Sequence, residues 1–350
     1  MDEQKFNEFL HRFVGDLGAT ASAGGIVLGD RLGLYRALAD GGPQTPDVLA
    51  SSTDTAARYV EEWLRGQAAS GYVDFDEASG TYSLNAEQAF ALTDPDGAIF
   101  MPGAFQLALG TLASIDQVEK AFRTGGGVGW HEHNDDVFVG CERFFRPGYT
   151  AHLTTEWLPA LDGVVEKLEQ GGSILDVGCG LGASTMLMAE RFPNSTVTGC
   201  DYHTRSIDLA RKQAAERGIA ERTRFDYAGA STFGGGPFDL ITTFDSLHDM
   251  GDPVAAAHHI LSNLSEGGTW MIVEPAAADD VAGNMNPVGR VFYGFSTFLC
   301  VPNAVSQGGA RTLGAQAGEN AIRQVTEEAG FTRFRRVAQT PFNLVYEVRR

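Results

Sequence analysis

The residues whose types and spacing best suit chemistry lie at 173–182, SILDVGCGLG, where an apolar run ends in Gly178, Gly180 and Gly182. Glycine reaches positive φ angles and lets a ligand approach the backbone closely. A strand that ends in such a loop and continues into a helix is typical of nucleotide binding, and several kinds of nucleotide use it. The pattern therefore predicts a nucleotide-binding turn and leaves its ligand open.

The carboxylate of Asp176, inside the apolar run, helps to decide between ligands. A dinucleotide places its pyrophosphate at the helix N-terminus, where an adjacent carboxylate would repel it. S-adenosylmethionine (SAM) instead presents an ammonium and a sulfonium, which a carboxylate attracts. Asp176 therefore favours SAM over NAD. The alternative is a buried acid that caps the amides of its own loop.

A second carboxylate, Asp201, ends the next apolar segment in STVTGCD. An acid at this place can accept hydrogen bonds from both hydroxyls of a ribose, which NAD and SAM share. We expect the neighbouring Tyr202 either to lie along the adenine ring or to pack on the surface.

The sequence FDSLHDMGDP follows a further apolar segment at 238–243. Active sites of open α/β sheets lie at the carboxyl ends of the strands. His248 is therefore a candidate base, since imidazole titrates near neutrality, and Asp249 would hold its tautomer. Phe244 and Asp245 would line the cofactor pocket. The alternative for His248 is a cap on the following helix.

Two further segments could meet the molecule that is acted on. In WHEHNDD, His131 and His133 would share one face of an extended segment. We expect them to reach the substrate or to lie in a solvated loop. Because the sequence identifies no third metal ligand, we predict no metal there. The insertion 276–320 carries Phe292, Tyr293 and Phe295. These aromatics predict a largely apolar organic acceptor, and the alternative is an ordinary packed helix.

The elements that must position these residues follow from hydrophobic patterning. Apolar segments alternate with helical ones, as in a parallel sheet. Two final segments are too close for a crossover helix and must be antiparallel. The sequence predicts an α/β, Rossmann-like seven-stranded sheet with a terminal hairpin, its strands at 173–177, 195–200, 222–227, 238–243, 268–274, 331–338 and 342–348.

The first part of the chain predicts a mainly α winged-helix domain. Residues 4–40 are helical in pattern with a break near Gly24–Gly25, Thr45-Pro46 begins a helix, and Ser52 or Thr53 begins another. That last helix would bury Tyr59, Val60, Trp63 and Leu64, and a hairpin would follow at 78–80. We expect a winged-helix-like dimerisation domain at 1–95, a helical connector and lid at 96–170, and the nucleotide-binding domain at 171–350.

Composition excludes several classes of protein. The net charge of −19 repels phosphate backbones, so nucleic acid is not expected as a partner. There is no signal peptide pattern and no apolar run long enough for a membrane span. The four cysteines, Cys141, Cys179, Cys200 and Cys300, form no C-x-x-C pair, which fits a reduced cytoplasm and no zinc framework.

Taken together, ILDVGCGLGAST, VTGCD, FDLITTFDSLHDMGDP and LSEGGTWMIVEP resemble the class I SAM-dependent methyltransferases over residues 171–350. With the winged helix and RFFRPGY, the chain is similar to an actinobacterial group of small-molecule methyltransferases. The resemblance implies a homodimer paired through the N-terminal module, contact of Tyr149 with the SAM tail, and methylation of a small hydrophobic metabolite. It implies oxygen as the favoured acceptor atom, with carbon or nitrogen as alternatives.

One position departs from the family pattern. Members often carry an acid after the third strand that holds the adenine amino group, and Gly229 stands there in this chain. Ser231 or a backbone carbonyl would have to replace it, unless Asp226 reaches that place. Two other functions stay open: a SAM-sensing winged-helix regulator without catalytic activity, and a degenerate NAD-dependent oxidoreductase.

Overall fold

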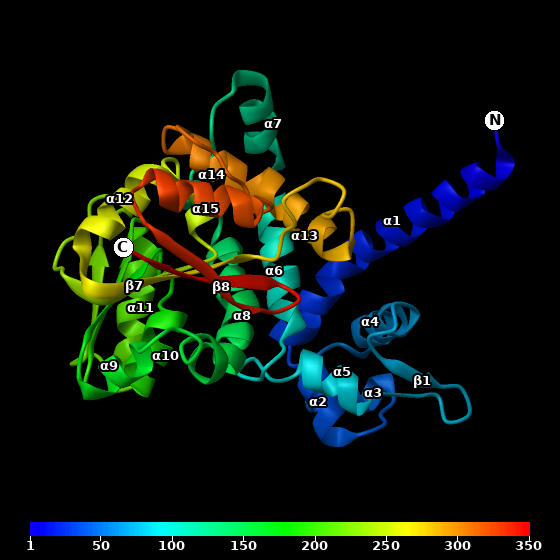
Figure 1. Ribbon diagram of the computed structural model, residues 1–350. Coiled ribbons are helices and arrows are strands. Elements are labelled where there is room, and N and C mark those ends of the chain that lie inside the picture. Colours follow the sequence, from blue (N-terminus) through cyan, green and yellow to red (C-terminus); the bar gives the residue numbers. More distant parts are fainter. The chain divides into compact units, whose positions relative to one another are not determined.

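The computed structural model describes all 350 residues, Met1–Arg350, as two compact units. Unit 1 comprises residues 1–109 and 139–147, and unit 2 comprises residues 110–138 and 148–350 (Figure 1). Helices α6 (Met101–Leu112) and α8 (Asp135–His152) contribute residues to both units. The expected division at residues 95 and 170 is a functional one and stays a prediction.

Unit 2 is built on a mixed sheet of seven strands in the order β5-β4-β3-β6-β7-β9-β8. The first five strands along the chain pair in parallel, and β9 pairs antiparallel with both β7 and β8. The predicted sheet and its terminal hairpin are therefore confirmed. The strands are β3 (Ser173–Val177), β4 (Thr196–Asp201), β5 (Thr223–Tyr227), β6 (Phe238–Phe244), β7 (Leu264–Pro275), β8 (Arg333–Gln339) and β9 (Asn343–Arg349).

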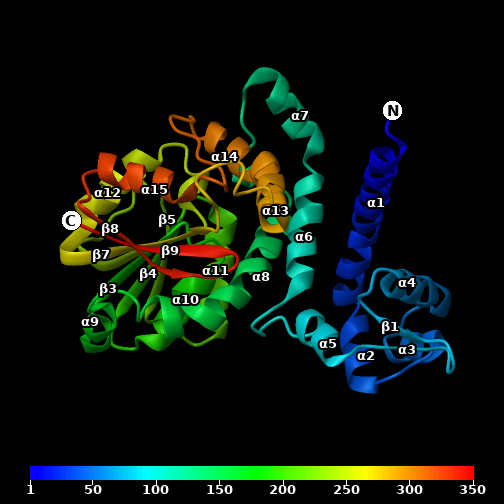
Figure 2. The same cartoon turned by 45° about the vertical axis from the view of Figure 1, so that its right-hand side comes forward.

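Helices cover both faces of this sheet. Figures 1 and 2 show α12 (Pro253–Asn263) and α15 (Gly318–Glu328) on one side and α10 (Ala183–Arg191) on the other. Burial on both faces explains why β3, β6 and β7 read as nearly continuous apolar runs. The remaining helices of unit 2 are α7 (Ile115–Thr124), η1 (Trp130–Glu132), η2 (Leu153–Trp157), α9 (Val164–Gln170), α11 (Thr204–Glu216), η3 (Leu247–Asp249), α13 (Pro287–Phe295), η4 (Ser296–Cys300) and α14 (Val301–Ser306).

The strand order reverses between β3 and β6, which lie side by side at the centre of the sheet. From β3 the chain moves outward through β4 to β5, and from β6 it moves outward through β7 the other way. In open α/β sheets such a switch point leaves a crevice at the carboxyl ends of the strands. The glycine loop after β3 and Asp245 after β6 both lie at this crevice.

Unit 1 has the predicted winged-helix order, with a short hairpin in which Phe75 pairs with Tyr82. Its buried core draws on the helices and the hairpin together, including Ile26, Leu38, Leu64 and Tyr82. Its further elements are α1 (Glu3–Arg31), α2 (Leu34–Gly41), α3 (Pro46–Ser52), α4 (Ala57–Ala69), β1 (Asp74–Asp76), β2 (Thr81–Ser83) and α5 (Ala86–Leu92).

The expected break of the first helix at Gly24–Gly25 is wrong. α1 runs unbroken to Arg31, and the chain turns at Gly33, whose φ is 69°. Glycines inside α1 serve close packing instead. A Cβ on Gly29 would lie 2.5 Å from the Tyr35 ring, and one on Gly25 would lie 2.8 Å from the Gln67 amide.

The expected start of the next helix at Ser52 or Thr53 is also wrong, because α3 ends there and α4 begins at Ala57. The Thr53 hydroxyl donates back to the carbonyl of Leu49 at 2.8 Å, and Asp54 has a positive φ of 51°, which breaks the helix. On α4, Val60 and Leu64 are buried as expected, Trp63 is half-buried, and Tyr59 is 82% exposed.

Candidate active site

The glycine loop after β3 has the backbone that its sequence demands. Gly178, Gly180 and Gly182 have φ angles of 74°, 51° and 83°. Neighbouring atoms crowd two of them, since a Cβ on Gly178 would lie 2.9 Å from Ser246 and one on Gly182 would lie 2.7 Å from the Phe225 ring. A Cβ on Gly180 would meet nothing within 4 Å. The loop is thus closely packed at its two outer glycines and open at Gly180, where a ligand can approach the backbone.

Asp176 lies beneath this loop and is fully buried. Its carboxylate accepts hydrogen bonds from the hydroxyls of Ser184 at 2.6 Å, Thr185 at 2.7 Å and Thr242 at 2.9 Å. Burial raises the pKa of Asp176, and the three hydroxyl hydrogen bonds oppose that rise. These hydrogen bonds match the alternative of a buried acid, and contact of Asp176 with the cationic tail of a ligand stays a prediction. Its partners are hydroxyls of α10 and β6 instead of the loop's amides, so Asp176 holds the loop against the sheet.

Asp201 ends β4 and faces the same loop. Its carboxylate accepts from the amide of Gly180 at 2.9 Å and from the amide of His203 at 2.8 Å. Burial raises the pKa of Asp201, against the effect of these amide donors. A carboxylate has about four acceptor positions, so Asp201 can hold the loop and still accept from ligand hydroxyls.

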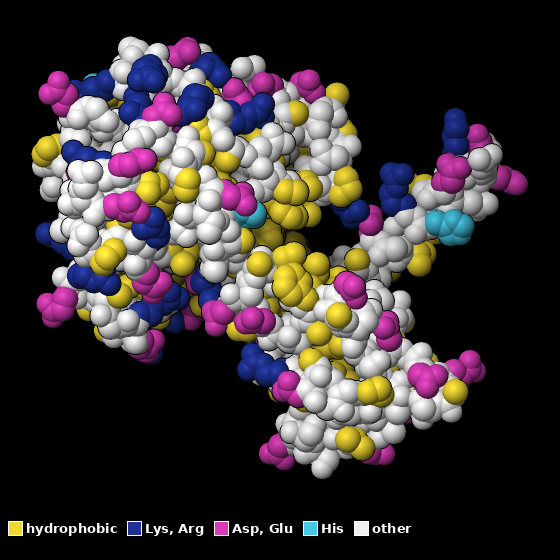
Figure 3. All heavy atoms as spheres, turned by 60° about the horizontal axis from the view of Figure 1, so that its bottom comes forward, with side chains coloured by type: hydrophobic (Ala, Val, Ile, Leu, Met, Phe, Trp, Pro, Cys, Tyr) yellow, Lys and Arg dark blue, Asp and Glu magenta, His cyan; other side chains and the backbone are white.

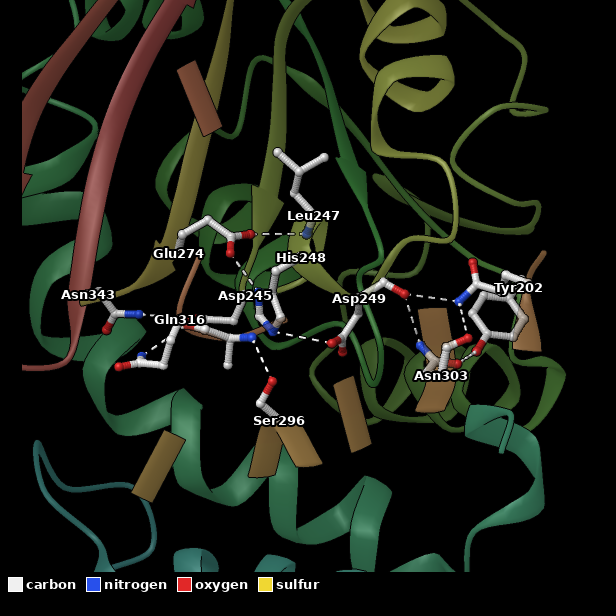
Figure 4. A network of polar contacts seen from close by, with 12 residues as sticks. Tyr202, Asp245, Leu247, His248, Asp249, Glu274, Ser296, Asn303, Gln316 and Asn343 are labelled. Carbon is white, nitrogen blue, oxygen red and sulfur yellow. Dashed lines mark hydrogen bonds and ion pairs between the residues drawn. The ribbon is translucent and has the colours of Figure 1, made fainter. Parts of the chain in front are cut away.

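The side chain of Tyr202, next to Asp201, turns toward the insertion after β7. Its hydroxyl donates to Asn303 Oδ1 at 2.8 Å, and the amide of Trp130 donates to the same oxygen at 3.1 Å. The amide nitrogen of Asn303 in turn donates to the carbonyl of Asp249 at 3.2 Å. Asn303 thus links three segments that surround the crevice (Figure 4).

Asp245 follows β6 with a positive φ of 46°, which is uncommon for a residue other than glycine. Its carboxylate accepts from the hydroxyl of Tyr149 at 2.8 Å and from the amide of Asn343 at 3.0 Å. Burial and then the charge of Glu274 raise the pKa of Asp245 to about 8. The ring of Tyr149 packs on Phe244, with ring centroids 5.0 Å apart. The structure therefore brings the expected residues Tyr149, Phe244 and Asp245 together.

His248 lies in η3, 4% exposed, between two carboxylates (Figure 4). Its Nδ1 is 2.6 Å from Glu274 Oε2, and its Nε2 is 3.2 Å from Asp249 Oδ1. Burial alone would lower the pKa of His248, but the charges of Glu274 and Asp249 outweigh it and hold that pKa well above its usual value. Glu274, which also accepts from the amide of Leu247 at 3.1 Å, is the main tautomer partner in place of Asp249.

The expectation that His131 and His133 share a face does not hold. The chain forms the 3-10 turn η1 there instead of an extended segment, so His131 is exposed and His133 is buried. His133 Nδ1 lies 2.8 Å from the hydroxyl of Ser114, and burial lowers the pKa of His133. The two rings therefore do not share a face, and contact of either ring with the acceptor stays a prediction.

The three aromatic residues singled out in the insertion after β7 also differ from one another in their surroundings. Phe292 is buried in its own helix packing, whereas Tyr293 lines a pocket of about 550 Å³, and Phe295 is half-buried outside the pocket lining. All twelve lining residues are uncharged: Ala121, Phe122, Gly125, Gly126, Tyr293, Ser296, Thr297, Val301, Pro302, Val305, Leu313 and Gln316. Among them, Gln316 carries a buried Oε1 that accepts no hydrogen bond.

The expected adenine contact at Ser231 stays a prediction. Ser231 is exposed in a turn closed by the amide of Thr232 donating to the carbonyl of Gly229 at 3.0 Å. Asp226, the other candidate, lies on β5 with its carboxylate 2.7 Å from Arg224. In the pairing of β5 with β4, Asp226 lies opposite Cys200, one residue before β4 ends at Asp201.

Sequence reasoning missed Glu274, Asn303, Asn343 and Cys300. One of them had a signal: Glu274 is a carboxylate near the end of the apolar run TWMIVEP, the pattern that singled out Asp176. The others have no local signal, because their partners lie 51 to 173 positions away in the chain.

Comparisons with known proteins agree with the fold. Residues 168–329 match the family model described as a methyltransferase domain, and residues 20–94 match an Rv2258c-like winged HTH domain. The O-methyltransferase cnsE of Penicillium expansum is 31% identical over 175 residues, 49% of this chain and 61% of that protein. The 2-heptyl-1-hydroxyquinolin-4(1H)-one methyltransferase of Mycobacteroides abscessus is 38% identical over 119 residues, 33% of this chain and 47% of that protein. The chain thus spans less than two thirds of the length of these curated relatives.

Among solved structures, human N-acetylserotonin methyltransferase in complex with SAM superposes with a TM-score of 0.70. It is 16% identical, and the match covers 97% of each chain. An O-methyltransferase family protein from Burkholderia thailandensis has a TM-score of 0.69 at 15% identity, over 100% of this chain and 98% of that one. At such identity the likeness shows the fold.

Proposed function

We propose that this chain, in which a class I methyltransferase domain follows an Rv2258c-like winged HTH domain, transfers the methyl group of SAM to a small, largely hydrophobic organic molecule. The observation that carries the proposal is the meeting of two features at one switch point. A glycine loop open at Gly180 lies beside Asp201, and a buried pair is formed by His248, which follows β6, and Glu274, which lies near the end of β7.

The residues at the crevice fit SAM. Asp201 has acceptor positions for ribose hydroxyls, and Asp245 with Tyr149 offers a carboxylate for an ammonium group. SAM, when bound, would supply a methyl group that a nucleophile attacks, with the demethylated product of SAM as the leaving group. The protein must align that nucleophile and exclude water.

His248 is the proposed base. Glu274 accepts from Nδ1, so the neutral ring keeps its lone pair on Nε2, where it can take the proton of a hydroxyl group. The two carboxylates then stabilise the imidazolium that forms. The same arrangement favours an oxygen acceptor over a carbon or nitrogen acceptor, because a hydroxyl gains most from a nearby base.

The uncharged pocket is the proposed site for the acceptor molecule. A volume of about 550 Å³ lies within the range of pockets for small organic ligands. The unpartnered oxygen of Gln316 would accept from a hydroxyl or amine of that molecule. These features favour a neutral, mainly apolar metabolite with few polar groups, as secondary metabolites often are.

A screen of SAM consumption against a panel of aromatic and aliphatic hydroxylated metabolites, with mass spectrometry of the products, tests the function. We expect a product heavier by one methylene unit from a neutral hydroxylated acceptor. SAM binding without consumption across the whole panel would instead favour the SAM-sensing regulator.

Affinity for SAM should depend on pH through Asp245. The raised pKa means that the carboxyl group is largely protonated below about pH 8, and it must ionise to pair with an ammonium. We therefore expect SAM affinity to rise by up to about tenfold per pH unit between about pH 6 and 7.5. Isothermal titration at several pH values measures this rise.

The variant Asp245→Asn is the control for this rise. Asparagine tolerates a positive φ, so the backbone can be kept while the titration is removed. Its SAM affinity should be weaker and nearly independent of pH. An equal rise with pH in Asp245→Asn would show that another group titrates.

The proposed assembly is a homodimer paired through α1. Every residue from Met1 to Thr20 except Asp16 is exposed, although this stretch carries an apolar stripe at helical spacing: Phe6, Phe9, Leu10, Phe13, Val14 and Leu17. Within unit 1 only the second half of α1 is buried, at Ala23, Ile26 and Val27 (Figure 1). Large apolar side chains exposed in a row mark an interaction surface, and a second copy of the same helix offers a matching one.

The double variant Phe9→Asp, Phe13→Asp should convert a dimer into a monomer in multi-angle light scattering. The helix itself should persist, since both side chains are exposed in one chain at 66% and 52%. Tyr59→Asp is the matched control, because it also charges an exposed aromatic on another helix. A monomeric wild-type protein would contradict the dimer.

The winged helix is proposed as a pairing module and not as a reader of nucleic acid. Both arginines of α4 are already paired with glutamates, Arg58 with Glu62 at 2.6 Å and Arg65 with Glu61. Figure 3 shows acidic side chains spread over unit 1 and no patch of basic side chains on the face of unit 1 that is in view. None of the helices combines the length and the apolar character needed to cross a bilayer.

A further inference from the structure

We propose that His248, Asp249 and Cys300 form a binding site for one divalent cation that favours sulfur ligands, such as Zn²⁺. The three side chains offer one nitrogen, one oxygen and one sulfur, and these atoms all lie within 4.8 Å of one another. Neither the sequence nor the likeness to methyltransferases assigns a metal here.

The distances suit a cation after small side-chain shifts. His248 Nε2 and Asp249 Oδ1 are 3.2 Å apart, and the sulfur of Cys300 lies within 4.8 Å of the ligand atoms of both residues. Tetrahedral zinc sites have bonds of about 2.0–2.3 Å, so neighbouring ligand atoms lie about 3.3–3.8 Å apart. The nitrogen and oxygen atoms, 3.2 Å apart, lie just below this range, and the widest separation, up to 4.8 Å, must close by about 1 Å.

Two further observations point to a ligand at this place. Glu274 accepts from Nδ1 of His248 at 2.6 Å, so in the neutral ring the lone pair of Nε2 faces the cluster. A carboxylate behind the imidazole in this way is the usual support of a metal-binding histidine. Asp249 Oδ1 is buried and accepts no hydrogen bond, although Nε2 lies 3.2 Å away. An oxygen in that condition lacks the partner that a cation would supply.

The donor set selects the class of cation. One imidazole, one thiolate and one carboxylate suit Zn²⁺ and its relatives, whereas Mg²⁺ prefers six oxygen ligands. Three protein ligands leave a fourth position open, as in zinc sites that keep a water or substrate. Asp249 is 19% exposed and gives the cation a route to the cluster. If the proposed function holds, a bound cation occupies Nε2 and stops proton removal by His248.

Titration of the metal-free full-length protein with Cd²⁺ tests the site without relying on activity. Cadmium bound to a thiolate absorbs in the ultraviolet, so binding at Cys300 gives a direct signal. We expect saturation at one equivalent per chain, displacement by Zn²⁺ and no displacement by Mg²⁺. Absence of the absorption at one equivalent would overturn the site, even if the chain methylates its acceptor.

Variants locate the signal. Cys300→Ser should abolish the absorption, whereas Cys141→Ser, which changes a cysteine outside the cluster, should keep it. Glu274→Gln should weaken Cd²⁺ affinity by about 10–100-fold, because it removes the support of the imidazole but no ligand atom. Circular dichroism verifies that each variant is folded. If Cys300→Ser does not fold, Asp249→Asn replaces it as the variant that removes a ligand atom. Full absorption in a folded Cys300→Ser or Asp249→Asn variant would contradict the proposed ligands.

Discussion

His248→Ala should lower kcat by about 10²–10⁴-fold with the true acceptor, the range that general base catalysis contributes. His248 Nε2 is the base atom in the proposed reaction, and alanine leaves the buried carboxylates of Glu274 and Asp249 without their imidazole. The affinity for SAM should change far less than kcat, because the proposed SAM contacts lie on Asp201 and Asp245, and His248 acts on them only by lowering the pKa of Asp245. Steady-state kinetics with isothermal titration of SAM separates the two effects.

The rate of the parent enzyme should rise with pH, and the direction follows from the raised pKa. His248 accepts a proton only in its neutral form, and its carboxylate neighbours favour the charged form. The rise should therefore come above the usual histidine pKa of about 6.5, in contrast to the near-neutral titration that the sequence suggested. Of the two carboxylates, Glu274 raises the pKa of His248 more, so Glu274→Gln should move the rise in rate toward lower pH.

The matched control is His258→Ala, which removes an exposed histidine on α12. It should leave both kcat and SAM affinity unchanged. Nearly full kcat in a folded His248→Ala variant would make His248 a structural residue. His131 and His133 would then be the next candidates for the base, and if neither mattered, alignment of the acceptor alone would carry the reaction.

Asp201→Ala should weaken SAM binding by about 1–3 kcal/mol, or about 5–150-fold, because a charged acceptor of the ribose hydroxyls is lost. The amides of Gly180 and His203 also lose their acceptor, so the loop contributes to the loss. Asp201→Asn keeps one carbonyl oxygen and should lose less. Isothermal titration with SAM, its demethylated product and NAD measures all three affinities.

Asp208→Ala is the control for Asp201→Ala, since Asp208 is an exposed acid on α11 that pairs with Arg211 at 3.4 Å. Its SAM affinity should equal that of the parent protein. Heat from NAD, with none from SAM or its product, would restore the dinucleotide interpretation of the glycine loop. Equal SAM affinity in Asp201→Ala would place the ribose elsewhere.

The sequence by itself determined the sheet and the glycine loop. Alternation of apolar and helical segments predicts parallel strands, and the few residues between the last two strands force the hairpin, because both constraints act over short distances along the chain. The three glycines likewise imply positive φ angles at their own positions. For the same reason a local pattern placed Thr45-Pro46 correctly at the start of α3.

Only the tertiary structure decided what the polar groups contact. Asp176 reads as a ligand for a cation, but hydroxyls of α10 and β6 surround it. His248 reads as a partner of Asp249, but Glu274, 26 positions away, takes its Nδ1. Cys300 has no neighbour in sequence that suggests a site, and the fold brings it to both residues of the pair. Hydrogen bonds and charge interactions join whichever side chains the packing brings together, so their partners depend on the whole chain and cannot be derived from local spacing.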